Sequence, residues 1–295
     1  MSFGLIGAEK AQHAVSRLCQ VLGVTRAGYY AWRRRGPSRR ARADDALGRR
    51  IRQIFASSHA TYGVPRVPAE LRETYGLRVG RKRVARLMRA QGIAGVSRRG
   101  QRRRTTIPDR TAPPAPDLVQ RRFQAEGPNQ LWVADLTYVP THEGWLFLAA
   151  VVDLFSRRVV GWSMRDDLKA DLVVDALAMA VARRRPKPGL IHHSDRGAQY
   201  TSLAFGRTLR DSGLVASMGS RGDAYDNAAC ESFIATIKTE LIRRQTWKTR
   251  DQARLAVFRY IETFYNPRRR HSALGYHSPM QFELLRARRE DTAVA

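Results

Sequence analysis

Three acidic residues, Asp135, Asp195 and Glu231, stand in apolar surroundings where a carboxylate is unusual. Asp135 falls in the middle of a run that predicts a central strand, and a buried carboxylate there is costly unless it is paired, hydrogen-bonded or bound to a metal. Asp195 follows a short apolar run that predicts a buried strand, and Glu231 begins an amphipathic helix after 35 intervening residues. Three such carboxylates around a pair of Mg²⁺ or Mn²⁺ ions would suit phosphoryl transfer.

A salt bridge or a helix cap is the usual explanation for a single buried acid, and Asp153 is a fourth acid of this kind. Three acids distributed over strand, strand and helix in a strongly basic chain favour a shared metal site instead. Lys238 adds a cation to the same helix face as Glu231, because it lies seven residues, or two turns, further on.

The second half of the chain contains the elements that must position these acids. We expect a meander of three antiparallel strands, followed by alternating helices and strands. The strands are expected at residues 130–140, 145–153, 157–164 and 215–218, with a fourth in chain order reaching Asp195, and the helices at 171–185, 203–214, from Glu231 onward, and 250–265. The pattern predicts an α/β domain, a mixed five-stranded sheet flanked by helices.

The first half predicts basic helical modules. Residues 14–35 have the pattern of a helix-turn-helix that contacts DNA through Arg26 and Arg33. Its second helix would carry a basic, aromatic surface that includes Tyr29, Tyr30 and Trp32, although an ordinary helical hairpin with core aromatics fits the same pattern. Three further helical patterns follow within 44–96, where Arg81, Lys82 and Arg83 contact DNA or merely form a solvated face. The expected divisions are a helix-turn-helix segment (1–43), a basic helical module (44–96), a basic, Pro-rich linker with Arg102, Arg103 and Arg104 (97–128), a catalytic core (129–245), and a C-terminal helix with a basic tail (246–295).

The charge of the chain indicates a polyanionic partner, which we expect to be double-stranded DNA. The formal net charge is +27 and the pI is about 11.4. Residues 1–128 contain 28 Lys and Arg against 8 Asp and Glu, whereas residues 129–295 contain 25 against 18. Two distant cysteines, no apolar stretch of membrane-spanning length and no signal-peptide pattern predict a soluble cytoplasmic protein with no membrane contact.

The second half of the chain contains four long motifs: Trp132-Val-Ala-Asp-Leu-Thr-Tyr, Val152-Asp-Leu-Phe-Ser-Arg-Arg-Val-Val-Gly-Trp, His193-Ser-Asp-Arg-Gly-Ala-Gln-Tyr and Asp226-Asn-Ala-Ala-Cys-Glu-Ser-Phe. Together they resemble the catalytic core of bacterial insertion-sequence transposases of the DDE type, which is similar to that of retroviral integrases. The segment Tyr265-Asn-Pro-Arg-Arg-Arg-His-Ser-Ala-Leu-Gly-Tyr-His-Ser-Pro resembles the C-terminal signature of that group. The resemblance implies a ribonuclease-H-like fold and a transposase that cleaves and joins DNA at the ends of an insertion element.

The resemblance also implies roles for single residues. Asp135, Asp195 and Glu231 would be the metal ligands, and Lys238 would touch the DNA phosphate near the scissile bond. The side chains expected to support the ligands or contact the substrate are His193, Ser194, Gln199, Tyr200 and Asn227, with Asp153 structural or supporting. Zinc is not expected, since no Cys or His has finger spacing.

The group's proteins also suggest partners. Their catalytic chain is often fused by frameshifting to an upstream helix-turn-helix protein, so residues 1–10 could be an arbitrary start. Joining two DNA ends calls for a homo-oligomer. Two alternatives stay open: a nuclease of the same fold that never joins, and a non-enzymatic DNA-binding regulator, which leaves the three acids unexplained. A general RNA-binding protein is disfavoured, because no strands rich in stacking aromatics are visible.

Overall fold

A computed structural model describes residues 2–97, 125–195, 197–218 and 228–294. Asn227, Arg102, Arg103, Arg104 and most of the expected linker at 97–128 lie outside the described residues.

The N-terminal part consists of three short helices, α1 (Ser2–Glu9), α2 (Val15–Val21) and α3 (Arg26–Arg34). The two helices and the turn expected within 14–35 are present: Gly23 takes the left-handed conformation (φ +64°) between α2 and α3, and the Thr25 hydroxyl caps α3 by accepting a hydrogen bond of 3.0 Å from the Gly28 N–H. α1 was not predicted. The expectation that Tyr29 lies on a basic, aromatic surface is wrong, because its ring fills a small core, while the neighbouring Tyr30 is exposed.

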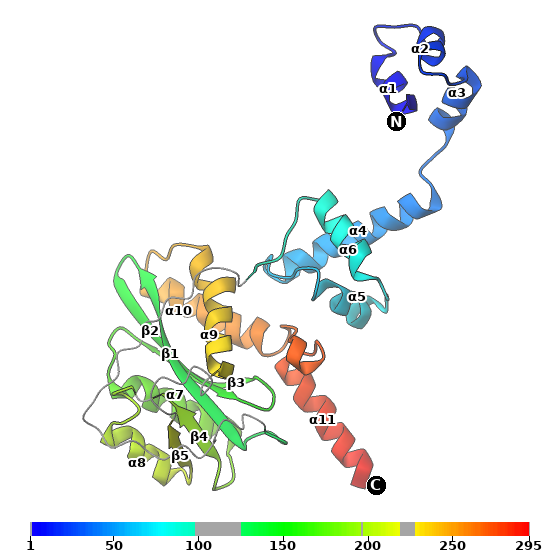
Figure 1. The fold of residues 1–295 in the computed structure, drawn as a ribbon. Coiled ribbons are helices and arrows are strands. Elements are labelled where there is room, and N and C mark those ends of the chain that lie inside the picture. The colour runs from blue at the N-terminus through cyan, green and yellow to red at the C-terminus, as the bar shows by residue number, and fades with distance from the viewer. Residues whose placement is uncertain (1, 98–124, 196, 219–227, 295) are drawn as a thin grey trace.

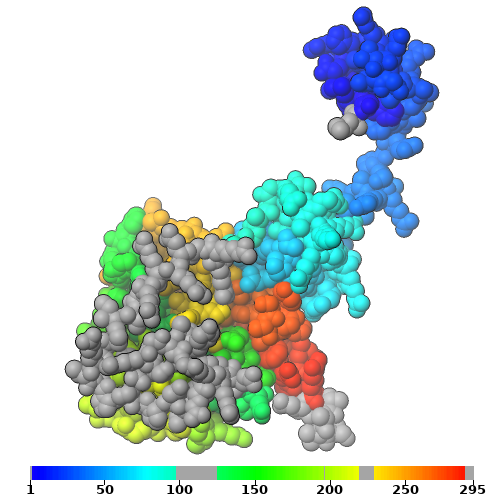
Figure 2. Space-filling model, viewed as in Figure 1, coloured from blue at the N-terminus to red at the C-terminus, as the bar shows by residue number. Residues whose placement is uncertain are grey.

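A second helical module, which we call the docking module, comprises α4 (Arg39–Ser57), α5 (Val67–Tyr75) and α6 (Arg81–Ala90). The apolar faces expected from helical periodicity are confirmed, since Ile51, Ile54 and Val84 are buried in one cluster. Figures 1 and 2 show this module against the domain that is expected to hold the three acids, which we call the catalytic domain, with α1–α3 set apart from both.

The catalytic domain is built on a mixed five-stranded sheet, as predicted. Its strands are β1 (Leu131–Thr141), β2 (Gly144–Asp153), β3 (Val159–Arg165), β4 (Ile191–Ser194) and β5 (Val215–Met218). The spatial order is β3-β2-β1-β4-β5, with β2 antiparallel to both β1 and β3 and β4 parallel to both β1 and β5. The short parallel strands are mostly buried, and β4 buries the polar side chains of His192, His193 and Ser194, whereas the meander has an exposed hairpin tip.

Helices cover both faces of the sheet (Figure 1). One face packs against α7 (Ala170–Arg184) and α8 (Leu203–Asp211). The other packs against α9 (Ala228–Glu240) and α10 (Arg250–Arg259), and a π-helical turn at Tyr260–Tyr265 continues α10 over the range predicted as one long helix.

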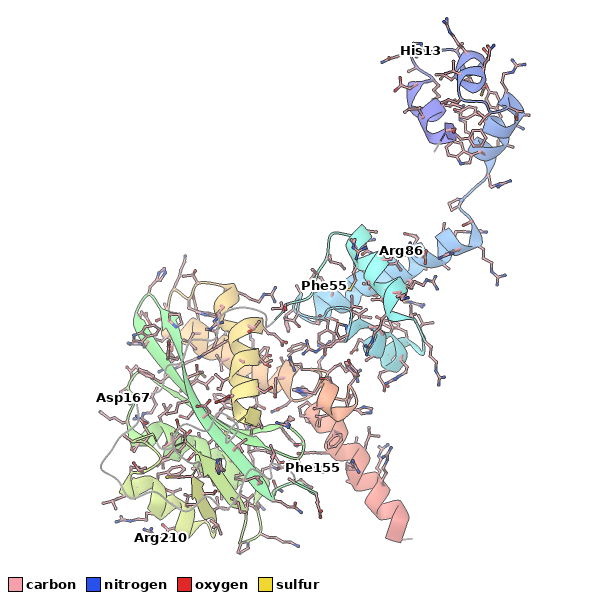
Figure 3. The ribbon with its side chains drawn as sticks, in the orientation of Figure 1. His13, Phe55, Arg86, Phe155, Asp167 and Arg210 are labelled. Atoms are coloured by element: carbon pink, nitrogen blue, oxygen red, sulfur yellow. The ribbon has the colours of Figure 1, made fainter. Side chains whose placement is uncertain are left out.

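A short 3₁₀ turn at Ile242–Arg244 joins α9 to α10. After the π-helical turn, a second 3₁₀ turn at Ser272–Leu274 leads to α11 (Pro279–Val294). α11 is held to the end of β2 by a contact between the rings of Phe282 and Phe155, whose centroids lie 5.2 Å apart (Figure 3). No helix in the described part of the chain is long and apolar enough to cross a membrane.

The docking module is joined to the catalytic domain through the C-terminal signature segment. The Tyr62 hydroxyl accepts a hydrogen bond of 2.8 Å from the Arg270 N–H, and the Arg270 guanidinium donates to Glu70 at 2.8 Å. Arg66 donates to the Arg270 carbonyl at 3.0 Å, and the Tyr62 ring lies 6.2 Å from that of Phe264. The apolar cores of the module and of the α9 face of the sheet are therefore continuous.

Candidate active site

The register of the parallel strands brings Asp135 and Asp195 together. On β1 and β4, Leu131 pairs with Ile191 and Val133 pairs with His193. Continuing this register by two positions places Asp135 opposite Asp195, which directly follows the last residue of β4. Because side chains alternate with a period of two, both carboxylates emerge on the same face of the sheet as Val133, the face covered by α9.

The first turn of α9 lies over the same point of the sheet. Cys230 Sγ is 3.8 Å from the carbonyl oxygen of Ala150, and Ala150 is the residue that pairs with Asp135 across β2. Glu231 follows Cys230 directly, within the first turn of the helix. The helix thus brings a third carboxylate to Asp135 and Asp195 from outside the sheet.

The electrostatics of the site place Asp135 within reach of the charges of both Asp195 and Glu231. Burial and, after it, the charges of Asp195 and Glu231 raise the pKa of Asp135 to about 7, against the opposing effects of the Leu136 N–H and Lys238. Burial also raises the pKa of Asp195 and of Glu231 and lowers that of Lys238. Carboxylates crowded in this way are those that a divalent cation would stabilise in the ionised form.

The carboxylate oxygens are only partly engaged. Asp135 Oδ1 accepts a hydrogen bond of 2.7 Å from the Leu136 N–H, and Asp195 Oδ1 accepts one of 3.0 Å from the Gly197 N–H. An all-oxygen donor set fits Mg²⁺ or Mn²⁺ better than zinc. Within residues 2–97, 125–195, 197–218 and 228–294, however, no three His, Cys, Asp or Glu residues lie close enough to enclose a metal ion.

Most residues around Asp195 are buried in the fold rather than exposed at its surface. His193 and Ser194 are buried, and His193 Nδ1 lies 2.9 Å from the Ser217 hydroxyl, which links β4 to β5. The Tyr200 hydroxyl is buried and has no hydrogen-bond partner among the residues that the structure describes, and its pKa is raised by burial and then by Asp135 and Asp195. Gln199 donates to the Leu168 carbonyl at 3.1 Å.

Asp153 stands apart from the three acids. It pairs with Trp132, three register positions from the pair of Asp135 and Ala150. Its carboxylate accepts hydrogen bonds from the backbone N–H groups of Asn129 (2.8 Å) and Phe155 (2.9 Å), and burial raises its pKa. These contacts fix the turn that follows β2, and they correspond to the structural role that was one of the two expected for Asp153.

The cationic residues expected at DNA differ in their availability. Arg26 and Arg33 on α3, and Arg81 and Lys82 on α6, are exposed. Arg83 is instead engaged in an ion pair with Asp44 at 2.7 Å, and the nearby Arg86, labelled in Figure 3, pairs with the same carboxylate at 2.5 Å. The Lys238 ammonium lies 5.3 Å from the centre of the Tyr138 ring.

The carboxyl end of α9 is held by a buried ion pair that the sequence did not reveal. Arg269 donates to Glu240 through Nε (2.7 Å) and Nη2 (2.6 Å), and the side chain of Arg269 is 1% exposed. The Tyr260 hydroxyl donates to the same carboxylate at 2.8 Å, and Arg66 of the docking module lies 3.5 Å from it. The helix that carries Glu231 is thereby fastened at its far end to both the signature segment and the docking module.

Comparison with known proteins agrees with this architecture. Family models described as "Integrase core domain" match residues 125–224 and 212–279, and one described as "HTH-like domain" matches residues 42–101. The chain is 42% identical over 284 residues to the transposase for insertion sequence element IS629 of Shigella sonnei, covering 95% of this chain and 94% of that protein. It is 39% identical over 287 residues to transposase InsF for insertion sequence IS3A of Escherichia coli (strain K12), covering 96% and 98%.

Among solved structures, the catalytic core domain of HTLV-2 integrase in complex with magnesium is similar at a TM-score of 0.41 and 16% identity, over 54% of this chain and 99% of that one. The mixed five-stranded sheet and the integrase-core match confirm the ribonuclease-H-like fold that the motifs implied. Given relatives of such identity along nearly its whole length, the chain belongs to the family of insertion-sequence transposases with an integrase core domain.

Proposed function

We propose that this chain cleaves the ends of an insertion element and joins them to target DNA by metal-dependent phosphodiester hydrolysis and transesterification at Asp135, Asp195 and Glu231. The observation that supports this most is their convergence from β1, from the end of β4 and from α9 onto one face of the sheet. Membership of the transposase family supports DNA transposition in general, and the three acids are our assignment of where it occurs.

The three acids and Lys238 would have different roles in the reaction. The free carboxylate oxygens of Asp135, Asp195 and Glu231 would hold divalent cations, which supply Lewis acidity and activate the attacking oxygen. Lys238, seven residues along α9 from Glu231, would bind a phosphate beside the scissile bond and so align the strand. In cleavage, water attacks the phosphorus in line and the bond to the 3′-oxygen breaks. In joining, the freed 3′-hydroxyl attacks a target phosphate and releases the target's 3′-oxygen.

Double-stranded DNA, both element end and target, is the proposed partner. The HTH-like match over 42–101 and the net charge of +20 on residues 1–128 support DNA binding by the front of the chain. Arg26, Arg33, Arg81 and Lys82 are the exposed cations that we assign to it. Joining needs two ends held together, so we infer a homo-oligomer. Fusion to an upstream helix-turn-helix protein stays a prediction.

A strand-transfer assay on a cognate element end tests the proposal. Asp195→Asn, Asp135→Asn and Glu231→Gln should each abolish cleavage and joining in Mg²⁺ or Mn²⁺, while DNA affinity stays within about two-fold of wild type, since one carboxylate carries little of the phosphate-driven binding. Asp251→Asn is the matched control, because Asp251 is an exposed carboxylate on α10 outside the site, and it should keep full activity.

The products separate the remaining possibilities. Joined molecules from the wild type support a transposase, nicked products alone support a nuclease, and metal-independent binding without any product supports a regulator. Cleavage by Asp195→Asn at the wild-type rate would contradict the assignment of the site.

A further inference from the structure

The hairpin formed by β1 and β2 carries two exposed aromatic side chains near the catalytic acids. Tyr138 is 41% exposed and Trp145 is 51% exposed, and their rings meet edge to face with centroids 4.7 Å apart. In the hairpin register Tyr138 pairs with Phe147 and Trp145 pairs with Pro140, so the two rings are diagonal neighbours on one face. Together with the Lys238 ammonium, these rings form what we call the aromatic platform.

The tip of the hairpin is fixed by the segment that leads from α9 into α10. The His142 N–H donates to the carbonyl of Trp247 at 3.0 Å, and the Trp247 ring is buried. The Arg250 N–H donates to Glu143 at 2.8 Å, and its guanidinium donates to the Trp145 carbonyl at 3.2 Å. A ligand that used the aromatic platform would therefore meet a preorganised surface with little ordering left to accomplish.

The aromatic platform is linked to the acids through Lys238. Lys238 Nζ lies 5.3 Å from the Tyr138 ring centre and is also within electrostatic reach of Asp135. Asp135 and Tyr138 are three residues apart on β1, an odd spacing that directs their side chains to opposite faces of the sheet, so Lys238 on α9 is the group that connects the rings with the acids. A phosphate held by Lys238 would thus leave the base of its own or the next nucleotide beside the rings.

We propose that Tyr138, Trp145 and Lys238 bind an unpaired nucleobase of the DNA strand near the scissile phosphate, with the base stacked on the rings and a neighbouring phosphate held by Lys238. The inference rests on the proposed function, because it names a feature of the same substrate. A base in a duplex has both faces covered by its neighbours, so it can stack on a side chain only after leaving the helix. The site would be tolerant of sequence, since every base presents a π-face.

Binding of a single-stranded oligonucleotide by the full chain tests the stacking contact. At a salt concentration that weakens phosphate contacts, Trp145→Leu should bind about 5- to 150-fold more weakly than wild type, the range for loss of one base–aromatic stack, whereas Trp145→Phe should keep most of the affinity. Phe258→Ala is the matched control, because Phe258 is an equally exposed aromatic on α10, and it should bind like wild type. Equal thermal midpoints for the three variants would show that folding is unaffected.

Comparing leucine with phenylalanine at position 145 distinguishes a bound nucleobase from a bound apolar protein surface, because leucine is apolar but has no π-face. If Trp145→Leu binds as well as Trp145→Phe, the rings do not hold a base, and an apolar protein surface such as a second copy of the chain becomes the better occupant. That result overturns the proposal.

Photocrosslinking locates the base independently of activity. An element-end duplex with 5-iodouracil at positions next to the scissile phosphate should crosslink to the peptide containing Tyr138 or Trp145, and more strongly when the base is mispaired. Crosslinks confined to other peptides would overturn the proposal. Should the wild type neither cleave nor join, the proposed function fails, while the binding and crosslinking results still decide whether the aromatic platform holds a base.

Discussion

Removing the guanidinium of Arg269 should destabilise the protein more than removal of any exposed cation, because Glu240 would be left charged and buried. In Arg269→Met the apolar part of the side chain is kept, while the two hydrogen bonds to Glu240, of 2.7 and 2.6 Å, are lost. Breaking a buried ion pair by removing one partner costs about 3–5 kcal/mol. In a domain of this size such a loss lowers the thermal midpoint by about 6–20 °C.

The pH dependence of the loss identifies its cause. Burial alone would raise the pKa of Glu240, but the hydrogen bonds from Arg269 reverse this, and the pKa lies below its ordinary value. In the wild type, the stabilisation by Glu240 is therefore present above the carboxyl's unfolded pKa of about 4.3 and is lost only as the pH falls through the lower folded value. In Arg269→Met only Arg66 and the Tyr260 hydroxyl still oppose the effect of burial, so the folded pKa of Glu240 rises from its wild-type value. Protonation then relieves the buried charge, and the deficit relative to wild type should shrink as the pH is lowered from 7 towards 5.

Thermal and urea unfolding from pH 5 to 7 measure both effects, with hydrogen exchange of α9 as a local readout. Arg254→Met is the matched control, because its partner Asp251 is exposed and the pair should contribute nothing measurable. If Arg269→Met loses as little stability as the control, or if its loss of stability does not change with pH, the reasoning is refuted.

Three further changes have expected outcomes. Gly161→Ala should destabilise the protein by about 1–3 kcal/mol in urea unfolding, because the new Cβ would lie 2.7 Å from the Cβ of Ala180 on α7; full stability would contradict that close approach. The Asn266 side chain accepts a hydrogen bond from the Val159 N–H and donates one to the Val159 carbonyl, both at 2.9 Å. Asn266→Ala should lower the free energy of unfolding by about 1–3 kcal/mol for each of these two backbone groups, and Asn266→Asp should recover only the hydrogen bond from the Val159 N–H. Asp44→Asn should free two arginines for phosphate, steepening the log–log salt dependence of DNA binding by up to roughly 1–2; an unchanged slope would show that they do not face DNA.

Much of the catalytic domain could be predicted from the sequence because its patterns are local. The alternation of apolar residues gave β1, β2 and β5 within a residue or two of their observed ends, and helical periodicity gave α7 and α8. The three acids could be singled out because carboxylates are conspicuous in apolar runs. Their convergence could only be inferred from the family resemblance, since the register of β1 on β4 depends on residues some 60 positions apart in sequence, such as Val133 and His193.

The buried arginines could not be predicted, because charge runs are normally solvated. Arg269 and Arg270 belong to a segment that the sequence suggested is a helix with a basic tail, yet they are 1% and 4% exposed. Their partners Glu240 and Glu70 lie 29 and 200 positions away, and no local pattern marks such pairs. Tyr29 was misjudged for a related reason, since an aromatic on a basic helix fits a surface or a core equally well by periodicity alone.

The contact between Tyr62 and Arg270 has a consequence for the order in which the protein matures. The two residues are 208 positions apart, so the docking module leaves the ribosome long before the segment that receives it. At about 5–20 residues per second, synthesis of the intervening chain takes on the order of 10–40 s. For most of that period α9 has yet to be made, because its anchor residue Glu240 precedes Arg269 by only 29 positions. We therefore expect the module's basic surface to meet DNA near the site of synthesis before α9, which carries Glu231, exists and is secured.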